Sequence, residues 1–303
     1  MKGSPFYHQA ELVIRIIPFI YQEEVLAIKG GTAINYFIRN LPRFSVDIDL
    51  TYVPLKDRAH SLTDISKILN RISARIQKNI PNTSIRLKRT DGTVSTLFIQ
   101  RESLQIKVEA NTVIRGTIFP CLEKVMCEEA RTLFNQSPKA RISSLQDLYG
   151  GKICAAFDRQ HPRDFFDVKL LLENEGLTEE IRKAFIVYLI SHSRPMSELL
   201  EPHFKDIRSV FENEFQGMTR EAVSLKQLLD ARDKLLKHIH SDLTINERKF
   251  ILSVKECRPV WELLGLDGID RLPAVQWKLQ NLERMDRKKH AEAVERLKRC
   301  LDL

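Results

Sequence analysis

The sequence has few cysteines and no long hydrophobic run. Its five cysteines are an odd number, none of them forms a Cys-x-x-Cys pair, and no Cys/His cluster has the spacing of zinc ligands. This pattern argues against a disulfide framework or a zinc site and favours reduced thiols in the cytosol. No apolar run approaches the roughly 20 residues that span a bilayer, and the first residues lack the apolar core of a signal peptide. We therefore expect a cytoplasmic protein that is not inserted in a membrane.

Positive charge, in contrast, is in excess and is unevenly distributed. The formal net charge is +8. Residues 58–115 hold eleven lysines and arginines against four acidic residues, which gives this segment a net charge of +7. Such an imbalance suits a polyanion partner or a substrate that carries phosphates, although a basic surface also serves solubility alone. The basic segment 84–89 is a candidate contact for RNA.

The first part of the chain mixes strands and helices. Short buried runs or period-two alternation predict strands at residues 25–28, 45–52, 84–89, 94–101 and 104–111. Helical periodicity predicts helices at residues 32–40, 62–80, 143–157 and 163–173. Asp91 and Gly92 have the chemistry of a hairpin turn between the third and fourth strands. This mixture predicts an α+β fold.

The second part of the chain shows helical patterns only. No convincing strand pattern follows residue 178, and Thr244 and Glu247 have the spacing of a helix capping box. At roughly 150 residues per domain, the length allows two domains. We therefore predict a catalytic domain at residues 1–177, with a mixed sheet and helices, followed by an all-α domain at residues 178–303.

A glycine pair precedes two closely spaced carboxylates in the first domain. Gly30 and Gly31 follow a predicted strand, and Thr32 begins a predicted helix. Glycines let the backbone approach a ligand closely, and the start of a helix presents N–H groups to phosphate. Asp47 and Asp49 lie on one face of the next strand, where they repel each other. Divalent cations relieve such repulsion, and Mg²⁺ prefers carboxylate oxygens shared with substrate phosphates.

Glu109 is the candidate for a third carboxylate, on the polar face of the strand predicted at residues 104–111. With Asp47 and Asp49 it would hold two Mg²⁺ ions, or Mn²⁺ in their place. Two ions about 4 Å apart activate an attacking hydroxyl and stabilise a leaving pyrophosphate. An Asp-x-Asp pair alone is common, and two solvated strand carboxylates are the alternative interpretation. The order of glycine pair, helix, acidic strand and later strand acid is the more specific signal, and it favours catalysis.

Three stretches together resemble a known family. They read KGGTAINYFIRNLPRFSVDIDL, QIKVEAN and DLYGGKICAAFDRQHPRDFFDVKLL and cover about residues 26–172. They resemble the AbiEii/AbiGii toxin family, to whose broad set the MenT-type toxins belong. Its members are nucleotidyltransferase-fold toxins of bacterial toxin–antitoxin and phage-defence systems. Gly31 stands where the wider polymerase-β-like superfamily commonly has serine, and the gap to Asp47 is longer than in many members. Both departures are usual in this branch.

The resemblance implies a set of nucleotide-binding residues. In the first stretch these are Gly30, Gly31, Thr32 and Ser45. Lys29 and Arg43 flank the same motif, where they would approach phosphates or simply be solvated.

In the last stretch, Lys152 would reach the triphosphate and Arg159 would also meet phosphate. Asp164 or Asp167 would contact the nucleotide or assist deprotonation of the acceptor. The alternative interpretations are a surface lysine at 152, a first-turn acid at 164, and a helix salt bridge between Asp167 and Arg163. Lys107 shares a face with Glu109 and would pair with the carboxylates.

The leading hypothesis is a metal-dependent nucleotidyltransferase that moves a nucleoside monophosphate from an NTP to an acceptor hydroxyl. The resemblance implies tRNA, at its 3′ end, as the acceptor and an antitoxin of the winged-helix type as the partner. One alternative is nucleotidylation of a protein or small-molecule hydroxyl. Another is a non-catalytic regulatory module on the same fold, although such a module has little reason to crowd negative charge.

Overall fold

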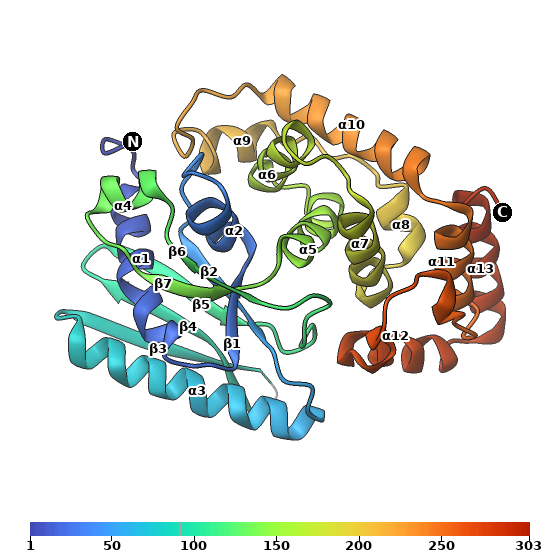
Figure 1. The fold of residues 1–303 in the computed structure, drawn as a ribbon, viewed down its shortest axis with the longest axis horizontal. Helices are drawn as coiled ribbons and strands as arrows, with labels where there is room; N and C mark the ends of the chain where they lie inside the picture. The colour runs from blue at the N-terminus through green and yellow to red at the C-terminus, as the bar shows by residue number, and fades with distance from the viewer. Residues whose placement is uncertain (91) are drawn as a thin grey trace. The chain divides into compact units, whose positions relative to one another are not determined.

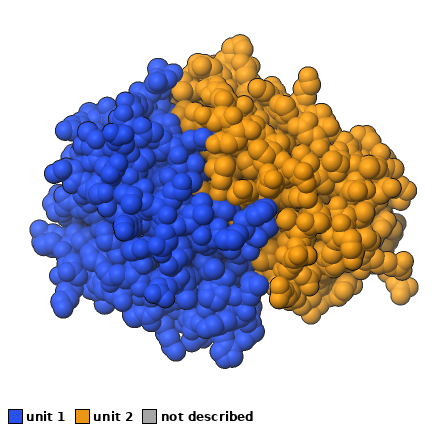
Figure 2. Space-filling model, viewed as in Figure 1, with its two compact units in different colours: residues 1–144, 216–222 blue, residues 145–215, 223–303 orange. Residues whose placement is uncertain are grey.

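The structure is a computed structural model that describes residues 1–90 and 92–303. The chain divides into two compact units, coloured separately in Figure 2. Unit 1 comprises residues 1–144 and 216–222, and unit 2 comprises residues 145–215 and 223–303. The sequence pattern placed the catalytic domain at residues 1–177, a span that includes two helices of unit 2. That these helices act with the catalytic domain stays a prediction.

Unit 1 is built on one mixed sheet, with seven strands among the described residues (Figure 1). The strands are β1 (Leu26–Lys29), β2 (Asp47–Tyr52), β3 (Thr83–Thr90), β4 (Thr93–Arg101), β5 (Leu104–Ala110), β6 (Leu122–Val125) and β7 (Lys139–Ile142). Their spatial order is β3-β4-β5-β2-β1-β7-β6. β2 pairs in parallel with β5, and β1 pairs in parallel with β7, while the other neighbours are antiparallel. The acidic strand β2 therefore lies in the middle of the sheet.

Helices cover the apolar face of this sheet. The helical segments of unit 1 are α1 (Tyr7–Tyr21), α2 (Gly30–Ala33), the π-helical η1 (Ile34–Ile38), α3 (Arg58–Asn79) and α4 (Glu128–Phe134). α1 packs on β5 and β7, and α3 packs on β3 and β4. Beneath them lie buried side chains such as Ile48, Val108 and Leu97, which share one face of β2, β5 and β4 by register. The acids of β2 and β5 alternate with these residues and so project from the other face.

A short segment from the second half of the sequence completes unit 1. Residues 216–222 pair with the stretch just before β2, through an isolated bridge between Arg43 and Thr219. The N–H of Phe44 donates to the carbonyl of Met218 at 2.9 Å, and Ser4 Oγ donates to the carbonyl of Gly217 at 2.7 Å. These bonds fix the chain where it enters the acidic strand.

Helices are the regular secondary structure of unit 2 in its described residues. Its helices are α5 (Leu145–Asp158), α6 (Pro162–Glu173), α7 (Glu179–Ser191), α8 (Met196–Leu200), α9 (Arg208–Glu214), α10 (Leu225–Asp242), α11 (Ile245–Lys255), α12 (Pro273–Glu283) and α13 (Arg287–Cys300), with 3₁₀ turns η2 (Trp261–Leu263) and η3 (Ile269–Arg271). α5 and α7 approach each other closely, because a Cβ on Gly150 would lie 2.8 Å from the carbonyl carbon of Ala184. Among the described helices, none combines the length and the apolar character needed to cross a bilayer.

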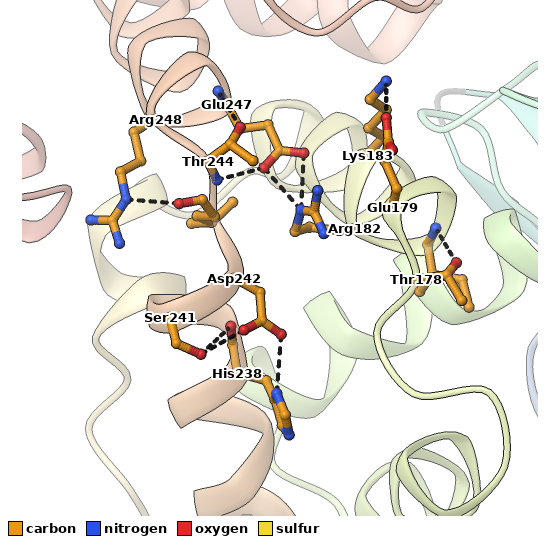
Figure 3. Close-up of polar contacts among 12 residues, drawn as sticks. Thr178, Glu179, Arg182, Lys183, His238, Ser241, Asp242, Thr244, Glu247 and Arg248 are labelled. Atoms are coloured by element: carbon orange, nitrogen blue, oxygen red, sulfur yellow. Dashed lines mark hydrogen bonds and ion pairs between the residues drawn. The ribbon is translucent and has the colours of Figure 1, made fainter.

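The start of α11 shows how unit 2 satisfies its buried polar groups (Figure 3). Thr244 Oγ1 accepts from the N–H of Glu247 at 3.2 Å, and the Glu247 carboxylate accepts from the N–H of Thr244 at 2.8 Å. This is the predicted capping box. The same carboxylate accepts a hydrogen bond from Arg182 of α7 at 2.9 Å, which joins α7 to α11.

The α+β fold class predicted from the sequence is confirmed, and each predicted strand corresponds to one of β1–β5. Three differences stand out. The helix after β1 begins at Gly30 and not at Thr32. The strands β6 and β7 were not predicted. The helix expected from residue 143 begins at Leu145. Of the expected hairpin turn, Asp91 lies outside the described residues, and Gly92 adopts a positive φ of 76°.

Candidate active site

Asp47 and Asp49 project side by side from the polar face of β2. Two residues apart on one strand, they point the same way, and neither is buried. The parallel register of β2 with β5 sets Lys107 opposite Asp47 and Glu109 opposite Asp49. The predicted acids therefore lie on neighbouring strands, with Glu109 directly beside Asp49 in register.

Lys107 supplies a positive charge among these acids. Its Nζ donates to the Glu109 carboxylate at 2.7 Å, and the two side chains are 35% and 40% exposed. The N–H of Lys107 donates to Asp47 Oδ1 at 3.2 Å. Burial disfavours the charged ammonium, but the hydrogen bond and charge of Glu109, together with Asp49 and Asp47, outweigh it and raise the pKa of Lys107. The predicted pairing of Lys107 with the carboxylates is confirmed.

The glycine pair is required because site side chains press against it. Gly30 has a φ of 67°, and a Cβ there would lie 2.8 Å from Asp49 Oδ2. A Cβ on Gly31 would lie 2.7 Å from an Nη atom of Arg43 and 3.0 Å from Ser45 Oγ. A side chain at either position would displace Asp49 or the Arg43 guanidinium. The pair thus brings α2 into direct contact with the acidic strand.

Thr32 and Ser45 belong to a buried network that anchors the start of β2. Thr32 Oγ1 donates to the carbonyl of Asp47 at 2.5 Å and lies 3.0 Å from Ser45 Oγ. The Tyr36 hydroxyl donates to the Ser45 carbonyl at 2.7 Å and accepts from the Ser45 N–H at 2.9 Å. Burial raises the pKa of Tyr36, so its phenol remains a hydrogen-bond donor at neutral pH. This network holds the backbone from which Asp47 projects.

Arg43 is buried, although the sequence also allowed a solvated residue there. It is the largest fully buried side chain among the described residues, and its Nη1 donates to the carbonyl of Phe44 at 2.8 Å. Its guanidinium lies against Gly31. Sequence reasoning missed the structural roles of Tyr36 and Arg43. The only local signal was their position on either side of the predicted turn between helix and strand.

The acids of unit 1 match the chemistry of a magnesium site. Carboxylate oxygens are the ligands that Mg²⁺ prefers, and proteins commonly bind it through one or two carboxylates plus substrate phosphates. Asp47 and Asp49 supply that pair. Across residues 1–90 and 92–303, no group of three or more acidic, histidine or cysteine side chains is arranged to hold a metal ion, and Glu109 is paired with Lys107. The role of Glu109 as a third ligand stays a prediction.

The other predicted residues form an ion cluster within unit 2. Lys152 of α5 lies 3.0 Å from Asp164 and 2.9 Å from Asp167, both on α6. Lys152 is 5% exposed and the two acids are 0% exposed. Burial disfavours the charged form of Asp164, but Lys152 and Arg159 outweigh it and hold the pKa of this carboxyl well below its ordinary value. Lys152 is therefore a buried ion-pair partner and not a surface lysine.

Arg159 is the exposed member of this cluster. Its side chain is 59% exposed, and its Nε and Nη2 donate to the two oxygens of Asp164 at 2.5 and 2.7 Å. This two-point bond fixes the plane of the guanidinium. Nearby, His161 caps the start of α6 by accepting from the N–H of Arg163 at 3.1 Å. Nucleotide contacts by the cluster stay a prediction.

Comparisons with known proteins agree with this picture. The family model described as nucleotidyl transferase AbiEii toxin, type IV TA system, matches residues 13–281. No curated protein matches the chain. The structure resembles that of MenT4, a nucleotidyltransferase toxin from Mycobacterium tuberculosis H37Rv, with a TM-score of 0.61 and 14% identity over 92% of this chain and 95% of that one. At that identity the likeness shows a shared fold.

A protein from H. pylori assigned as a nucleotidyltransferase is also similar, with a TM-score of 0.49 and 17% identity over 79% of this chain and 97% of that one. A TM-score of that size adds nothing to the assignment. The family match spans most of the chain and includes the glycine pair, the acids of β2 and β5 and the ion cluster on α5 and α6. The chain belongs to the AbiEii nucleotidyltransferase toxin family of type IV toxin–antitoxin systems.

Proposed function

We propose that this protein transfers a nucleoside monophosphate from an NTP to the 3′-terminal hydroxyl of a tRNA. A nucleotidyltransferase of a toxin–antitoxin system has an NTP as its substrate and an antitoxin as its partner. The observation that carries the proposal is the pair Asp47 and Asp49 on one face of β2, where Asp49 lies against Gly30 and has Glu109 beside it in register. Addition to the 3′ end would block aminoacylation and so stop translation.

The transfer needs no covalent enzyme intermediate. The oxygen of the acceptor hydroxyl attacks the α-phosphorus of the NTP, the new phosphodiester bond forms, and the bond between the α- and β-phosphates breaks. Pyrophosphate leaves, and the hydroxyl proton is released to solvent or to a nearby base. Positioning and charge stabilisation supply most of the rate in such phosphoryl transfers.

Each group in unit 1 has a task in this scheme. The backbone at Gly30 and Gly31, which has no side chain of its own and lies against Asp49 and the Arg43 guanidinium, is the proposed contact for the triphosphate. Asp47 and Asp49, with Glu109, hold divalent ions. When bound, Mg²⁺ or Mn²⁺ would neutralise charge on the phosphates and lower the pKa of the attacking hydroxyl. Lys107 balances the acids before substrate binds.

A labelling assay tests this function. Purified protein is incubated with Mg²⁺, total tRNA and each α-³²P-labelled NTP in turn, and Asp49→Asn serves as the inactive control. We expect label in tRNA with at least one NTP, lost on EDTA treatment and absent with the variant. No labelled RNA with any NTP would rule out this acceptor. Label that migrates with protein or a small product would instead establish a different acceptor hydroxyl.

The same site predicts toxicity in cells. Expression should arrest growth, Asp49→Ala should abolish the arrest, and a co-encoded antitoxin, which we propose to be of the winged-helix type, should relieve it. Arrest that persists in Asp49→Ala would favour a non-catalytic module. The substrates would place the activity in the cytoplasm, and phage defence is the proposed setting.

A further inference from the structure

A row of side chains crosses the polar face of the sheet from its acidic centre to one edge. The register pairs Asp47 of β2 with Lys107 of β5, Lys107 with Phe98 of β4, and Phe98 with Arg86 of the edge strand β3. Residues directly opposite in register project from the same face of a sheet. This row therefore lies on the face opposite to that covered by α1 and α3.

A second row runs beside the first. It begins at Asp49 and continues through Glu109 and Thr96 to Lys88 on β3. Thr96 Oγ1 lies 3.5 Å from the Glu109 carboxylate, which places both side chains on the polar face. Lys88 is exposed at the edge of the sheet. Along both rows the charge changes from acidic at β2 to basic at β3.

An aromatic ring lies between the two charged ends. The guanidinium of Arg86 sits 4.3 Å from the centre of the Phe98 ring, and Phe98 is only half-buried. A stacked guanidinium shows that a flat group fits over this ring, because Arg stacks on aromatic faces much as a base does. A partly exposed ring beside cations, on a face that otherwise holds polar side chains, is the pattern that binds single-stranded nucleic acid.

The dimensions of this face suit a short segment of single-stranded RNA. Neighbouring strands lie about 4.8 Å apart, so the three intervals from β2 to β3 separate the acids from Arg86 and Lys88 by about 14 Å. A few nucleotides cover that distance. A duplex does not fit this face as well, since its bases are stacked on each other and cannot reach the ring.

We propose that this face is the acceptor track of the enzyme, a proposal that rests on the proposed transfer to an RNA 3′ end. Phosphates of the last nucleotides lie on Arg86 and Lys88, and one base takes the place of the Arg86 guanidinium on the Phe98 ring. The RNA lies with its 3′ end toward β2. This polarity follows from charge: carboxylates repel phosphates, and the terminal 3′ hydroxyl is the part of the strand with no phosphate beyond it.

Binding measured without NTP separates the track from catalysis. The probe is a fluorescein-labelled single-stranded oligoribonucleotide with a free 3′ hydroxyl, titrated by anisotropy at several salt concentrations. The variants are Arg86→Gln, Lys88→Gln and Phe98→Leu. The matched control is Lys124→Gln, which removes an exposed lysine from β6, the opposite edge strand.

We expect Arg86→Gln and Lys88→Gln each to reduce the slope of log affinity against log salt by about 0.7, the value for one phosphate contact in a single strand. Phe98→Leu should weaken binding roughly five- to 150-fold at an unchanged slope, and Phe98→Tyr should bind as the wild type does. Lys124→Gln should bind as the wild type does. Melting temperatures of all variants identify any that fail to fold, and Arg86→Gln and Lys88→Gln, which change exposed side chains, carry the test if Phe98→Leu does not fold.

In the transfer assay, Arg86→Gln and Lys88→Gln should raise KM for RNA and leave KM for the NTP unchanged. The track is refuted if both bind RNA as Lys124→Gln does. It is also refuted if Phe98→Leu raises KM for the NTP alone, because the ring would then hold the incoming base. If transfer fails with every RNA while binding still depends on Arg86 and Lys88, the proposed reaction is wrong and the track stands.

Discussion

Each compact unit contains a group of acidic side chains, and the two groups differ in how far they are buried. In unit 1, Asp47, Asp49 and Glu109 lie beside Lys107 on a face where Lys107 and Glu109 remain 35% and 40% exposed. In unit 2, Asp164 and Asp167 are fully buried and are held by basic side chains.

This difference indicates separate roles: the group in unit 1 belongs to the active site, and the group in unit 2 stabilises the fold. A buried carboxylate is tolerated when cations and hydrogen bonds compensate it, so the cluster on α5 and α6 is complete as it stands. The acids of unit 1 are partly exposed, so a ligand can reach them. The first group is therefore expected to govern activity and the second to stabilise the fold, and nucleotide contacts by the second group stay a separate prediction.

The largest expected effect is a loss of activity from unit 1. Asp49→Asn keeps the size of the side chain but removes its charge, and we expect the rate of nucleotidyl transfer to fall by about a thousand-fold or more, equivalent to about 4 kcal/mol. The free energy of unfolding should change little, because the relieved repulsion with Asp47 offsets the lost attraction to Lys107. Label incorporation and urea denaturation measure the two quantities.

The matched control is Glu123→Gln, which neutralises an acid on β6 whose partner is Arg141. It should transfer label at the wild-type rate. A wild-type rate in Asp49→Asn, or a rate equally reduced in Glu123→Gln, would contradict the assignment of the site.

The next effect is a loss of stability from unit 2. Lys152→Met removes the ammonium between two buried carboxylates, and we expect the free energy of unfolding to fall by about 3–5 kcal/mol. Lys169→Met on α6 is the matched control, because its partner Glu173 is half exposed and such a pair contributes about 0–1 kcal/mol. Urea denaturation at pH 7 compares the two, and equal stabilities would contradict the proposed support.

The pH dependence of stability tests the role of the same cluster independently. Because Lys152 and Arg159 hold the pKa of Asp164 below its ordinary value, its ionised form stabilises the fold. That contribution is complete above about pH 4, the ordinary pKa of Asp, and is lost as the pH falls further. The difference in stability between wild type and Lys152→Met should therefore narrow below about pH 4.

The local parts of this picture could be predicted from the sequence. Alternation places Asp47 and Asp49 on one face of a strand and Glu109 on the polar face of another, since the two-residue period of a strand is a local property. β6 escaped prediction because all four of its residues are exposed and show no alternation. β7 is only four residues long.

The non-local parts could not be predicted. The register that sets Glu109 opposite Asp49 depends on how β2 and β5 meet, which no short window contains. Arg43 is buried partly because residue 219, far along the chain, pairs with it. The sequence suggested a triphosphate contact for Lys152, with a surface lysine as the alternative, and its burial between two carboxylates was not foreseen because both acids belong to the next helix.

The smallest expected effect tests how α5 supports the ion cluster. A Cβ on Gly150 would meet the backbone of α7 at 2.8–2.9 Å, and backbone cannot move aside. A Cβ on Gly151 would meet only the Tyr188 ring, at 3.2 Å, and a side chain can shift. Alanine raises helix propensity at both positions by up to about 1 kcal/mol. Overpacking costs about 1–3 kcal/mol.

The two terms have opposite signs, so the neighbouring glycines should respond differently. Gly150→Ala should lower the free energy of unfolding by about 1–2 kcal/mol, because overpacking exceeds the gain in helix propensity. Gly151→Ala should leave it unchanged or raise it slightly. Thermal unfolding of the two variants measures the difference. Equal melting temperatures would mean that α5 and α7 can separate at no cost, and the packing of α5 on α7 would then contribute nothing to holding Lys152 in the cluster.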